Sequence, residues 1–340
     1  GALVRKLINN ERNIVFNLDK LGYASDLESI DKLNKKNNFG NYSFLKVDLT
    51  DKENLYDAIE ISKPDIIMHL AAESHVDRSI DQPHHFLESN IIGTFNLLEV
   101  AKEYWLKLKP NRKNIFRFHH ISTDEVYGSL GEKGSFSELT SYDPRSPYSA
   151  SKASSDHLVR AWFHTYNFPI LITNCSNNFG PWQFPEKLIP LVISKALDGK
   201  KIPIYGDGLN VRDWLFVEDH VEALLLVIKK GEIGQCYCIG GYGERTNKYI
   251  VEFICSILDK RKPASSPHSK LIEYVKDRPG HDNRYSIDSS KIRNKLGWKS
   301  NFKLEESIEK TVNWYIDNYD WVKKIKAKSK YVGKRIGQIN

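Results

Sequence analysis

Short β-rich runs alternate with helical patterns along the first half of this chain, and this alternation limits the folds that it can adopt. The β-rich runs span residues 13–18, 44–47 and 65–70, with helical patterns at 54–62 and 86–106. Strands that alternate with helices form parallel sheets, because each crossover helix returns the chain to the same end of the sheet. The sequence therefore predicts an α/β fold with a Rossmann-like, doubly wound parallel sheet.

The start of the chain carries part of a dinucleotide-binding pattern. The run at 13–18 ends in Asp19, an acid that fits the group binding an adenosine ribose, with a turn residue or helix cap as the alternative. Residues 1–9 are typical of an amphipathic helix with no strand before it. A Rossmann domain begins with a strand and a glycine-rich phosphate loop. We expect the sequence to begin within or just after that loop, with Gly1 as its last remnant; loss of the loop is the alternative.

Composition narrows the class of protein. The 340 residues are 40% hydrophobic and 27% charged, which is ordinary for a soluble globular protein. No run approaches the eighteen or so apolar residues of a membrane span, so no membrane partner is expected. The net charge is +7, but the lysines and arginines are scattered among acidic residues rather than grouped in a basic block. This distribution argues against a nucleic-acid partner, and the mild positive charge suits an anionic substrate. The four cysteines lack Cys-x-x-Cys spacing, so we expect buried thiols in a reducing cytoplasm and no metal.

The second half is less regular. Strand-like runs are expected at 170–175, 201–208 and 211–217, helices at 188–197, 218–230, 289–296 and 304–318, and turns at 177–181. No linker rich in glycine, serine or proline divides the chain. We therefore predict a dinucleotide-binding Rossmann domain over 1–175 plus about 211–245. A smaller α/β substrate-binding region, over about 176–210 and 246–340, is interleaved with it.

Tyr148 and Lys152 open the helical pattern that runs to about residue 166. Positions i and i+4 share a helix face, and a nearby ammonium favours a phenolate, so this spacing predicts a base that removes an alcohol proton during hydride transfer. Taken alone, the pattern is more often a solvated lysine beside a packed tyrosine. Its place after a strand end favours the chemistry, because ligands of open α/β sheets bind at the carboxyl ends of the strands.

Asp124 and Glu125 follow the strand-like run at 116–121. Simple alcohol oxidation has no use for two more carboxyl groups, so the pair suggests a second chemical step. Adjacent residues on a strand point to opposite faces. For both side chains to reach one substrate, the strand must end before Asp124.

These motifs together closely resemble the extended short-chain dehydrogenase/reductase family, and within it the sugar-nucleotide 4,6-dehydratases. The resemblance covers nearly the whole chain, and the missing start is its one departure. The most specific segments are 70–79 (LAAESHVDRS), 122–128 (STDEVYG), 146–156 (SPYSASKASSD), 184–190 (FPEKLIP) and 277–282 (DRPGHD).

The resemblance implies a set of site residues. The implied catalytic residues are Thr123, Asp124, Glu125, Tyr148 and Lys152. The implied NAD-binding residues, besides Tyr148 and Lys152, are Asp19, Lys20, Leu21, Gly22, Asp48, Leu49, Leu70, Ala71, Ala72, Glu73, Ser74, Ser89 and Asn178. The implied substrate-binding residues are Ser74, Thr123, Asn177, Lys187, Leu188, Pro203, Ile204, Tyr205, Arg212, Asn247, Asp277, Arg278, Pro279, Gly280 and His281.

The resemblance also implies an activity and an assembly. The expected reaction converts dTDP-glucose to its 4-keto-6-deoxy product by C4 oxidation, C5/C6 elimination and C6 reduction with recycled NAD, in a deoxysugar pathway of the dTDP-rhamnose type. The alternatives are a 4,6-dehydratase or 4-epimerase for another sugar nucleotide, such as GDP-mannose or a UDP-sugar, and a catalytically silent binding subunit. The helices at 86–106 and around Tyr148 carry more apolar residues than one buried stripe needs, so a homodimer is expected.

Overall fold

A computed structural model describes residues 1–329, 331 and 337 of the chain. The part of the predicted substrate-binding region at 330, 332–336 and 338–340 lies outside the described residues. The strands are β1 Val15–Asp19, β2 Tyr42–Lys46, β3 Ile66–His69, β4 Arg117–Thr123, β5 Ile170–Cys175, β6 Asn177–Phe179, β7 Ile202–Tyr205, β8 Val211–Phe216, β9 Cys236–Ile239, β10 Glu244–Thr246 and β11 Ile272–Val275.

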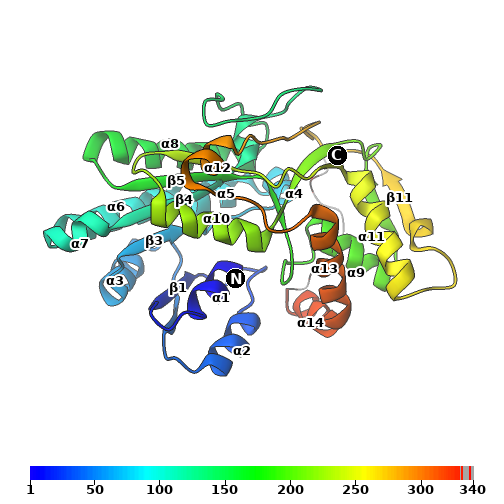
Figure 1. The fold of residues 1–340 in the computed structure, drawn as a ribbon, viewed down its shortest axis with the longest axis horizontal. Helices are drawn as coiled ribbons and strands as arrows, with labels where there is room; N and C mark the ends of the chain where they lie inside the picture. Colours follow the sequence, from blue (N-terminus) through cyan, green and yellow to red (C-terminus); the bar gives the residue numbers. More distant parts are fainter. Residues whose placement is uncertain (330, 332–336, 338–340) are drawn as a thin grey trace.

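Helices connect these strands, so that strand and helix alternate through most of the described chain (Figure 1). The α-helices are α1 Ala2–Ile8, α2 Glu28–Asn37, α3 Lys52–Ser62, α4 Val76–Asp81, α5 Pro83–Phe86, α6 Gly93–Lys107, α7 Pro110–Ile115, α8 Pro147–Tyr166, α9 Leu188–Leu197, α10 Val217–Lys230, α11 Asn247–Arg261, α12 Ser290–Leu296, α13 Leu304–Asp317 and α14 Tyr319–Ser329. Shorter helical turns are the π-helix η1 Leu87–Ile92 and the 3₁₀ helices η2 Asp124–Tyr127 and η3 His268–Leu271.

The central sheet is parallel and has the order β3-β4-β5-β9. Alternate residues of β5 face opposite layers, as the pleat requires. Ile170 and Ile172 pack in one core with residues of α3, α6 and α8, whereas Leu171 packs in another with α10 and α12. Helices therefore cover both faces of the sheet, which confirms the predicted doubly wound α/β fold. Strands β1 and β2 form a separate parallel pair.

A second region lies beside this sheet, at the right of Figure 1, where α9, α11, α13 and α14 gather. Its strands form a mixed sheet of order β10-β8-β6 and a parallel pair, β11-β7. Ile193 of α9, Ile254 of α11, Val312 of α13 and Val322 of α14 are buried in one shared core. These helices therefore form a packed unit of their own around the short strands.

Two segments differ from the sequence-based expectation. Residues 177–181 were expected to be turns, but Asn177–Phe179 forms β6, which pairs in parallel with β8. The partner strand satisfies the backbone groups of β6, and this tertiary pairing outweighs the turn preference of asparagine. The expected helix at 86–106 is real but not continuous, because the π-helix η1 interrupts it between α5 and α6.

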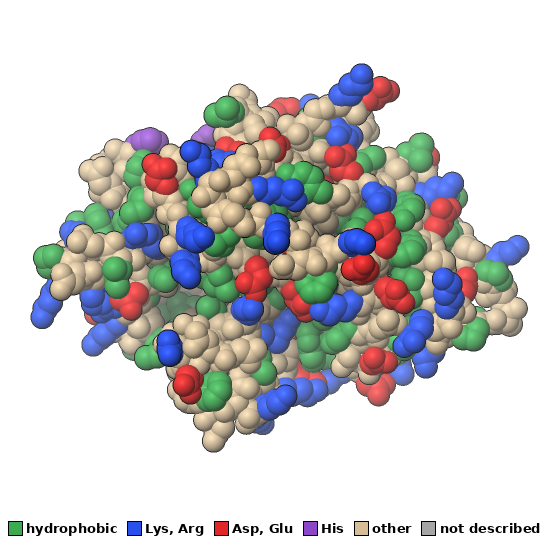
Figure 2. Space-filling view, in the orientation of Figure 1, with side chains coloured by type: hydrophobic (Ala, Val, Ile, Leu, Met, Phe, Trp, Pro, Cys, Tyr) green, Lys and Arg blue, Asp and Glu red, His purple; other side chains and the backbone are tan. Residues whose placement is uncertain are grey.

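The cysteines and the surface add two observations. All four cysteines are free thiols; three of them are buried as expected, but Cys175 is only partly buried. Within the described part of the chain, no helix combines the length and the apolar character that crossing a bilayer requires. On the face drawn in Figure 2, basic and acidic side chains are interspersed.

Candidate active site

The end of β4 places two carboxyl groups beside each other. β4 stops at Thr123, and the 3₁₀ turn η2 begins at Asp124. The Thr123 hydroxyl caps this turn by accepting a hydrogen bond from the Glu125 backbone N–H at 3.3 Å. Because the extended backbone ends here, Asp124 and Glu125 no longer alternate across a sheet. The requirement that the strand end before Asp124 is therefore met.

Helix α8 brings Tyr148 and Lys152 to the same place. Ser146 caps the helix in a capping box with Ser149, and Pro147 occupies its first turn, so the start of the helix is strongly specified. The Lys152 ammonium donates to the Ile121 carbonyl oxygen at 2.9 Å, which ties the helix to β4. Both expected side chains thus lie at the carboxyl end of the central strand.

The expected effect of Lys152 on Tyr148 is not found. Burial raises the pKa of Tyr148 well above its usual value, and the neighbouring Glu125 raises it further. A hydrogen bond with Thr123 acts in the opposite direction and lowers this pKa. The Lys152 charge is directed to a backbone carbonyl instead. The prediction of a lowered pKa was therefore wrong, because desolvation of the phenolate outweighs the helical neighbour.

Asp124 and Glu125 have different electrostatic surroundings. Burial raises the pKa of Asp124 well above its usual range, with Glu125 and Asp213 adding to the shift. Its Oδ2 atom is buried without a hydrogen-bond partner. Burial also raises the pKa of Glu125, but Arg278, Lys187 and Arg212 oppose that shift. The arrangement favours a proton on Asp124 and a charge on Glu125.

Three cations from distant parts of the chain face Glu125. Arg278 is held by Asp77, with 2.8 Å between Nη1 and Oδ1. Arg212 is buried, donates to the Asp282 carbonyl oxygen at 2.9 Å and lies 4.3 Å from the centre of the Tyr285 ring. Lys187 donates to the carbonyl oxygen of Ser74.

A cluster of guanidinium and ammonium groups suits a diphosphate, which accepts several charge-assisted hydrogen bonds. Lys187, Arg212 and Arg278 were each predicted from the sequence to bind substrate, and tertiary structure brings them together around Glu125.

Other predicted substrate residues surround this cluster. Tyr205, at the end of β7, donates to Asp77 Oδ2 at 2.9 Å, and His281 Nδ1 lies 2.6 Å from Asp277 Oδ1. The Oδ1 atom of Asn177 is buried without a partner. The remaining candidates lie on nearby elements: Pro203 and Ile204 on β7, Leu188 at the start of α9, Asn247 at the start of α11, and Pro279 and Gly280 between Arg278 and His281.

The predicted cofactor residues divide into two groups. Asp19 is the last residue of β1, and Asp48 lies in the turn after β2. The carboxylate of each accepts hydrogen bonds from residues that follow it in the chain. Lys20 reaches across to Glu73 at 3.4 Å. Leu21, Gly22 and Leu49 lie beside the two acids. The second group follows β3 and the end of β5: Leu70, Ala71, Ala72, Ser74, Ser89 and Asn178.

Polar atoms in and beside the second group lack hydrogen-bond partners. The Asn178 Oδ1 and Ser122 Oγ atoms are buried without partners at the carboxyl ends of the central strands. Parallel sheets bind dinucleotides at this edge. The chemistry of these residues therefore fits NAD.

Sequence reasoning missed Asn90, which orients the loop after β3. Its side chain is buried in the π-helix, accepts from the Glu73 backbone N–H at 2.8 Å and donates to the Ser151 hydroxyl at 2.8 Å. It thereby links the predicted cofactor loop to the helix carrying Lys152. An asparagine inside an apolar helical pattern was the available signal.

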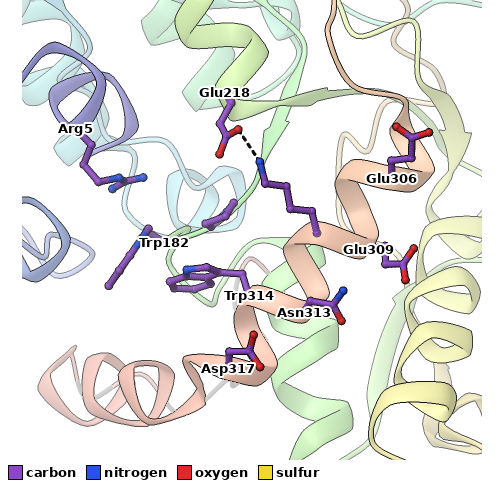
Figure 3. Close-up of a pocket in the computed structure, with 10 residues that line it drawn as sticks. Arg5, Trp182, Glu218, Glu306, Glu309, Asn313, Trp314 and Asp317 are labelled. Atoms are coloured by element: carbon purple, nitrogen blue, oxygen red, sulfur yellow. Dashed lines mark hydrogen bonds and ion pairs between the residues drawn. The ribbon is translucent and has the colours of Figure 1, made fainter. Parts of the chain in front are cut away.

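Two hollows lie away from the predicted catalytic residues. One of about 700 Å³ is bordered by the indoles of Trp182 and Trp314, whose ring centres are 4.7 Å apart, and by Arg5 (Figure 3). On its rim the Lys310 ammonium pairs with Glu218 at 2.8 Å. A second hollow, of about 210 Å³, includes Asp19 in its lining. Neither hollow is lined by a predicted catalytic residue, so cavity volume alone does not locate the chemistry.

Comparison with known proteins agrees with this geometry. Residues 1–311 match the family model described as GDP-mannose 4,6 dehydratase. The dTDP-glucose 4,6-dehydratase of Salmonella typhimurium is 52% identical over 336 residues, which cover 96% of this chain and 92% of that protein.

Two solved structures have the same fold over nearly the whole chain. The dTDP-glucose 4,6-dehydratase of Bacillus anthracis in complex with NAD has a TM-score of 0.82 at 41% identity, covering 95% of each chain. The enzyme of the same name from Streptomyces venezuelae, also with NAD, has a TM-score of 0.85 at 38% identity and again 95% of each chain. The shared sequence, fold and site geometry lead to one conclusion: the chain belongs to the GDP-mannose 4,6 dehydratase family of sugar-nucleotide-modifying enzymes.

Proposed function

We propose that this chain is an NAD-dependent hydro-lyase that converts dTDP-glucose to dTDP-4-keto-6-deoxyglucose and water. The observation that carries the proposal is the Asp124–Glu125 pair, which lies beside Tyr148 and faces three cations. Relatives that are about half identical over nearly the full chain are dTDP-glucose 4,6-dehydratases, which supports the same substrate here.

In the first step Tyr148 takes the proton of the glucose 4-hydroxyl as the C4 hydride leaves. Thr123 hydrogen-bonds the same oxygen, and its bond to Tyr148 lowers the pKa of the phenol. Lys152 lies one turn further along α8 and holds the nicotinamide ribose. NAD, when bound, supplies the hydride acceptor for C4, a positive charge near the phenol and later the hydride donor for C6, so it is not consumed.

The 4-ketone then acidifies the C5 hydrogen, and the two carboxyl groups divide the elimination between them. Glu125 takes the C5 proton, because the surrounding cations favour its charged form. Asp124 gives its proton to the C6 hydroxyl, which leaves as water, and its raised pKa keeps that proton available. Glu125 finally returns its proton to C5. The proton held by Tyr148 replaces the one that Asp124 lost.

The remaining site residues hold the nucleotide. We place the diphosphate on Lys187, Arg212 and Arg278, and the pyrimidine against β7. We also propose the division of the chain into a Rossmann domain over 1–175 with about 211–245, and a substrate-binding region over about 176–210 and 246 onward. The inclusion of β9 in the central sheet supports this division, whereas β8, at the start of 211–245, pairs with β6 and β10 of the second region.

A homodimer is the assembly that we propose. Leu87, Ile92 and Phe95 are exposed on η1 and α6, at 48%, 49% and 39% of their full accessible surface. Tyr166, at the end of α8, is also exposed. Apolar side chains of this size on adjoining helices suit a symmetric contact with a second copy.

The free cysteines support a reducing, cytoplasmic location, and the product suits a deoxysugar pathway of the dTDP-rhamnose type.

The main alternatives differ in substrate or in the number of steps. A dehydratase for GDP-mannose or a UDP-sugar needs the same catalytic groups and another base pocket. A 4-epimerase needs Tyr148 and Lys152 but has no use for a protonated Asp124 beside Glu125. A silent binding subunit needs none of them.

These alternatives can be distinguished by incubating the protein with dTDP-glucose, GDP-mannose and UDP-glucose in parallel. The alkaline absorbance of the 4-keto product is then measured in each reaction. We expect product from dTDP-glucose alone and none from the Tyr148→Phe variant. Product from another nucleotide sugar in preference to dTDP-glucose, or none from any, contradicts the proposal.

A further inference from the structure

Asp156 is a buried carboxylate with no part in the steps above. It lies on α8, one turn beyond Lys152, and is wholly inaccessible to solvent. Its Oδ1 lies 3.0 Å from His120 Nε2, and its Oδ2 accepts from the Tyr142 hydroxyl at 2.7 Å and from Asn174 Nδ2 at 3.3 Å. These partners come from β4, from the loop before α8 and from β5. A buried charge with this many donors is a costly feature that calls for a role.

The hydrogen bonds of Asp156 lead to the reacting groups. The same Asn174 amide donates to the Thr123 carbonyl oxygen at 3.0 Å. Asn174 therefore links Asp156 to the backbone of Thr123 through hydrogen bonds. Lys152, on the adjacent turn, donates to the carbonyl of Ile121 in the same strand. Helix α8 is therefore fastened to the end of β4 at two points, one through Lys152 and one through Asp156 and Asn174.

Two histidines and one cysteine near Lys152 do not supply a negative charge. His69 of β3 and His120 of β4 are neutral near pH 7, because burial lowers the pKa of both, that of His120 to about 4. Cys175 of β5 is a neutral thiol, because burial raises its pKa to about 12.

Asp156 itself stays charged. Hydrogen bonds from His120 and Tyr142, together with the charge of Lys152, hold its pKa below the usual value despite burial. Arg160, the next cation along α8, donates to the Tyr142 hydroxyl at 3.5 Å. Burial lowers the pKa of Lys152, and Asp156 is the largest influence that raises it.

We propose that Asp156 is a positioning residue for the reaction: its buried charge keeps the Lys152 ammonium protonated, and its hydrogen bonds hold Thr123 in place against Tyr148. The assignment rests on the function proposed above. Asp156 itself touches neither the sugar nor the cofactor. It sets the charge of Lys152 and the position of Thr123, which do. An uncompensated buried ammonium loses its proton more easily, and Asp156, one turn along the same helix face, supplies an opposite charge that favours the protonated form.

The test compares Asp156→Asn with Tyr142→Phe. The first removes the charge and keeps the shape, whereas the second keeps the charge and removes one of its hydrogen bonds. Turnover of dTDP-glucose and affinity for NAD are measured from pH 6 to 9.5, with circular dichroism as a check of folding. In Asp156→Asn, the alkaline limbs of both profiles are expected to move down by about one pH unit or more. In Tyr142→Phe, both limbs are expected to stay in place.

Loss of activity by one constant factor at every pH in Asp156→Asn, with unmoved NAD binding, overturns the charge role. Should that variant not fold, Asn174→Ser decides the positional role: a lowered kcat with unchanged NAD affinity supports it, and an unchanged kcat overturns it. If the parent protein fails to turn over dTDP-glucose, the proposed function is wrong. The pH dependence of NAD affinity in the Asp156→Asn variant still tests the charge role of Asp156.

Discussion

Asp124 and Glu125 are adjacent in sequence, yet their carboxyl groups lie in different electrostatic environments. Asp124 is almost wholly buried, and its pKa is raised by burial and by two neighbouring carboxyl groups. Glu125 is partly exposed, and three cations act against the rise in its pKa. This difference supports the proposed roles of Asp124 as the acid and Glu125 as the base of the elimination.

Asp124→Asn should complete the first oxidation and then stall. Tyr148 and Lys152 remain, but no group protonates the departing C6 oxygen, so NADH and a 4-keto intermediate accumulate. Turnover should fall by about 10² to 10⁴-fold, the usual range for a general acid. Rapid mixing with dTDP-glucose, followed at the NADH absorbance, gives the measurement. Asp65→Asn, on an exposed pair with Arg112, is the matched control. Dehydration at nearly the parent rate would assign the acid elsewhere.

Glu125→Gln and Tyr148→Phe should fail at different points. The glutamine variant still forms NADH but loses solvent exchange at C5, because no carboxylate removes that proton. The phenylalanine variant forms no NADH, because the 4-hydroxyl keeps its proton. Mass spectrometry of product formed in D₂O and single-turnover absorbance distinguish the two. Deuterium at C5 in the Glu125→Gln reaction at the parent rate would contradict the assigned base.

Arg278→Gln should weaken nucleotide binding. A charge-assisted hydrogen bond typically contributes about 1.5–3 kcal/mol, so affinity for dTDP should fall by roughly 10- to 100-fold. Titration calorimetry with dTDP measures this without catalysis. Arg112→Gln removes an exposed guanidinium and serves as the control. Equal affinity in the two variants would place the diphosphate away from Arg278.

Buried histidines should make the fold sensitive to acid. Burial lowers the pKa of His119 to about 3 and that of His220 to about 4, against 6.5 for an ordinary histidine. The unfolded chain therefore binds more protons than the folded one, and stability present above pH 6.5 is lost as the pH falls toward those values. His220→Leu should reduce the slope of unfolding free energy against pH by up to about 1.4 kcal/mol per pH unit between pH 6 and 4. Denaturant titration at several pH values checks this, with His164→Leu on the surface of α8 as the control. An identical slope in the two variants would exclude His220 as a source.

The exposed apolar side chains of η1 and α6 should form a dimer contact. We expect light scattering to give twice the chain mass of 39.2 kDa for the parent protein. Phe95→Glu should shift the protein toward the monomer, because a carboxylate would be buried in the contact. Leu139→Glu, at a loop residue that is 95% exposed, should leave the mass unchanged. A parent protein that is monomeric at micromolar concentration contradicts the proposed assembly.

Much of the fold could be predicted because its signals are local. The helix at 188–197 has the expected bounds, and the strands before Asp19, Asp124 and Asn177 lie within a residue or two of their expected places. Capping by Ser146 and periodic apolar residues act over one or two turns, so they can be recognised without a partner segment. Strand β6 was missed because its asparagines prefer turns, and only pairing with β8 makes the strand.

The sequence by itself determined the order of the elements, the residue types at the strand ends and the spacing of Tyr148 and Lys152. Tertiary structure decided what those groups can do. Desolvation raised the pKa of Tyr148 where helical spacing predicted a fall, and packing gathered Lys187, Arg212 and Arg278 around Glu125 from positions far apart in the chain. Asp156 acquired its partners from three separate segments. Burial and long-range charge depend on which segments meet, and that information is distributed over the whole fold rather than carried by any one motif.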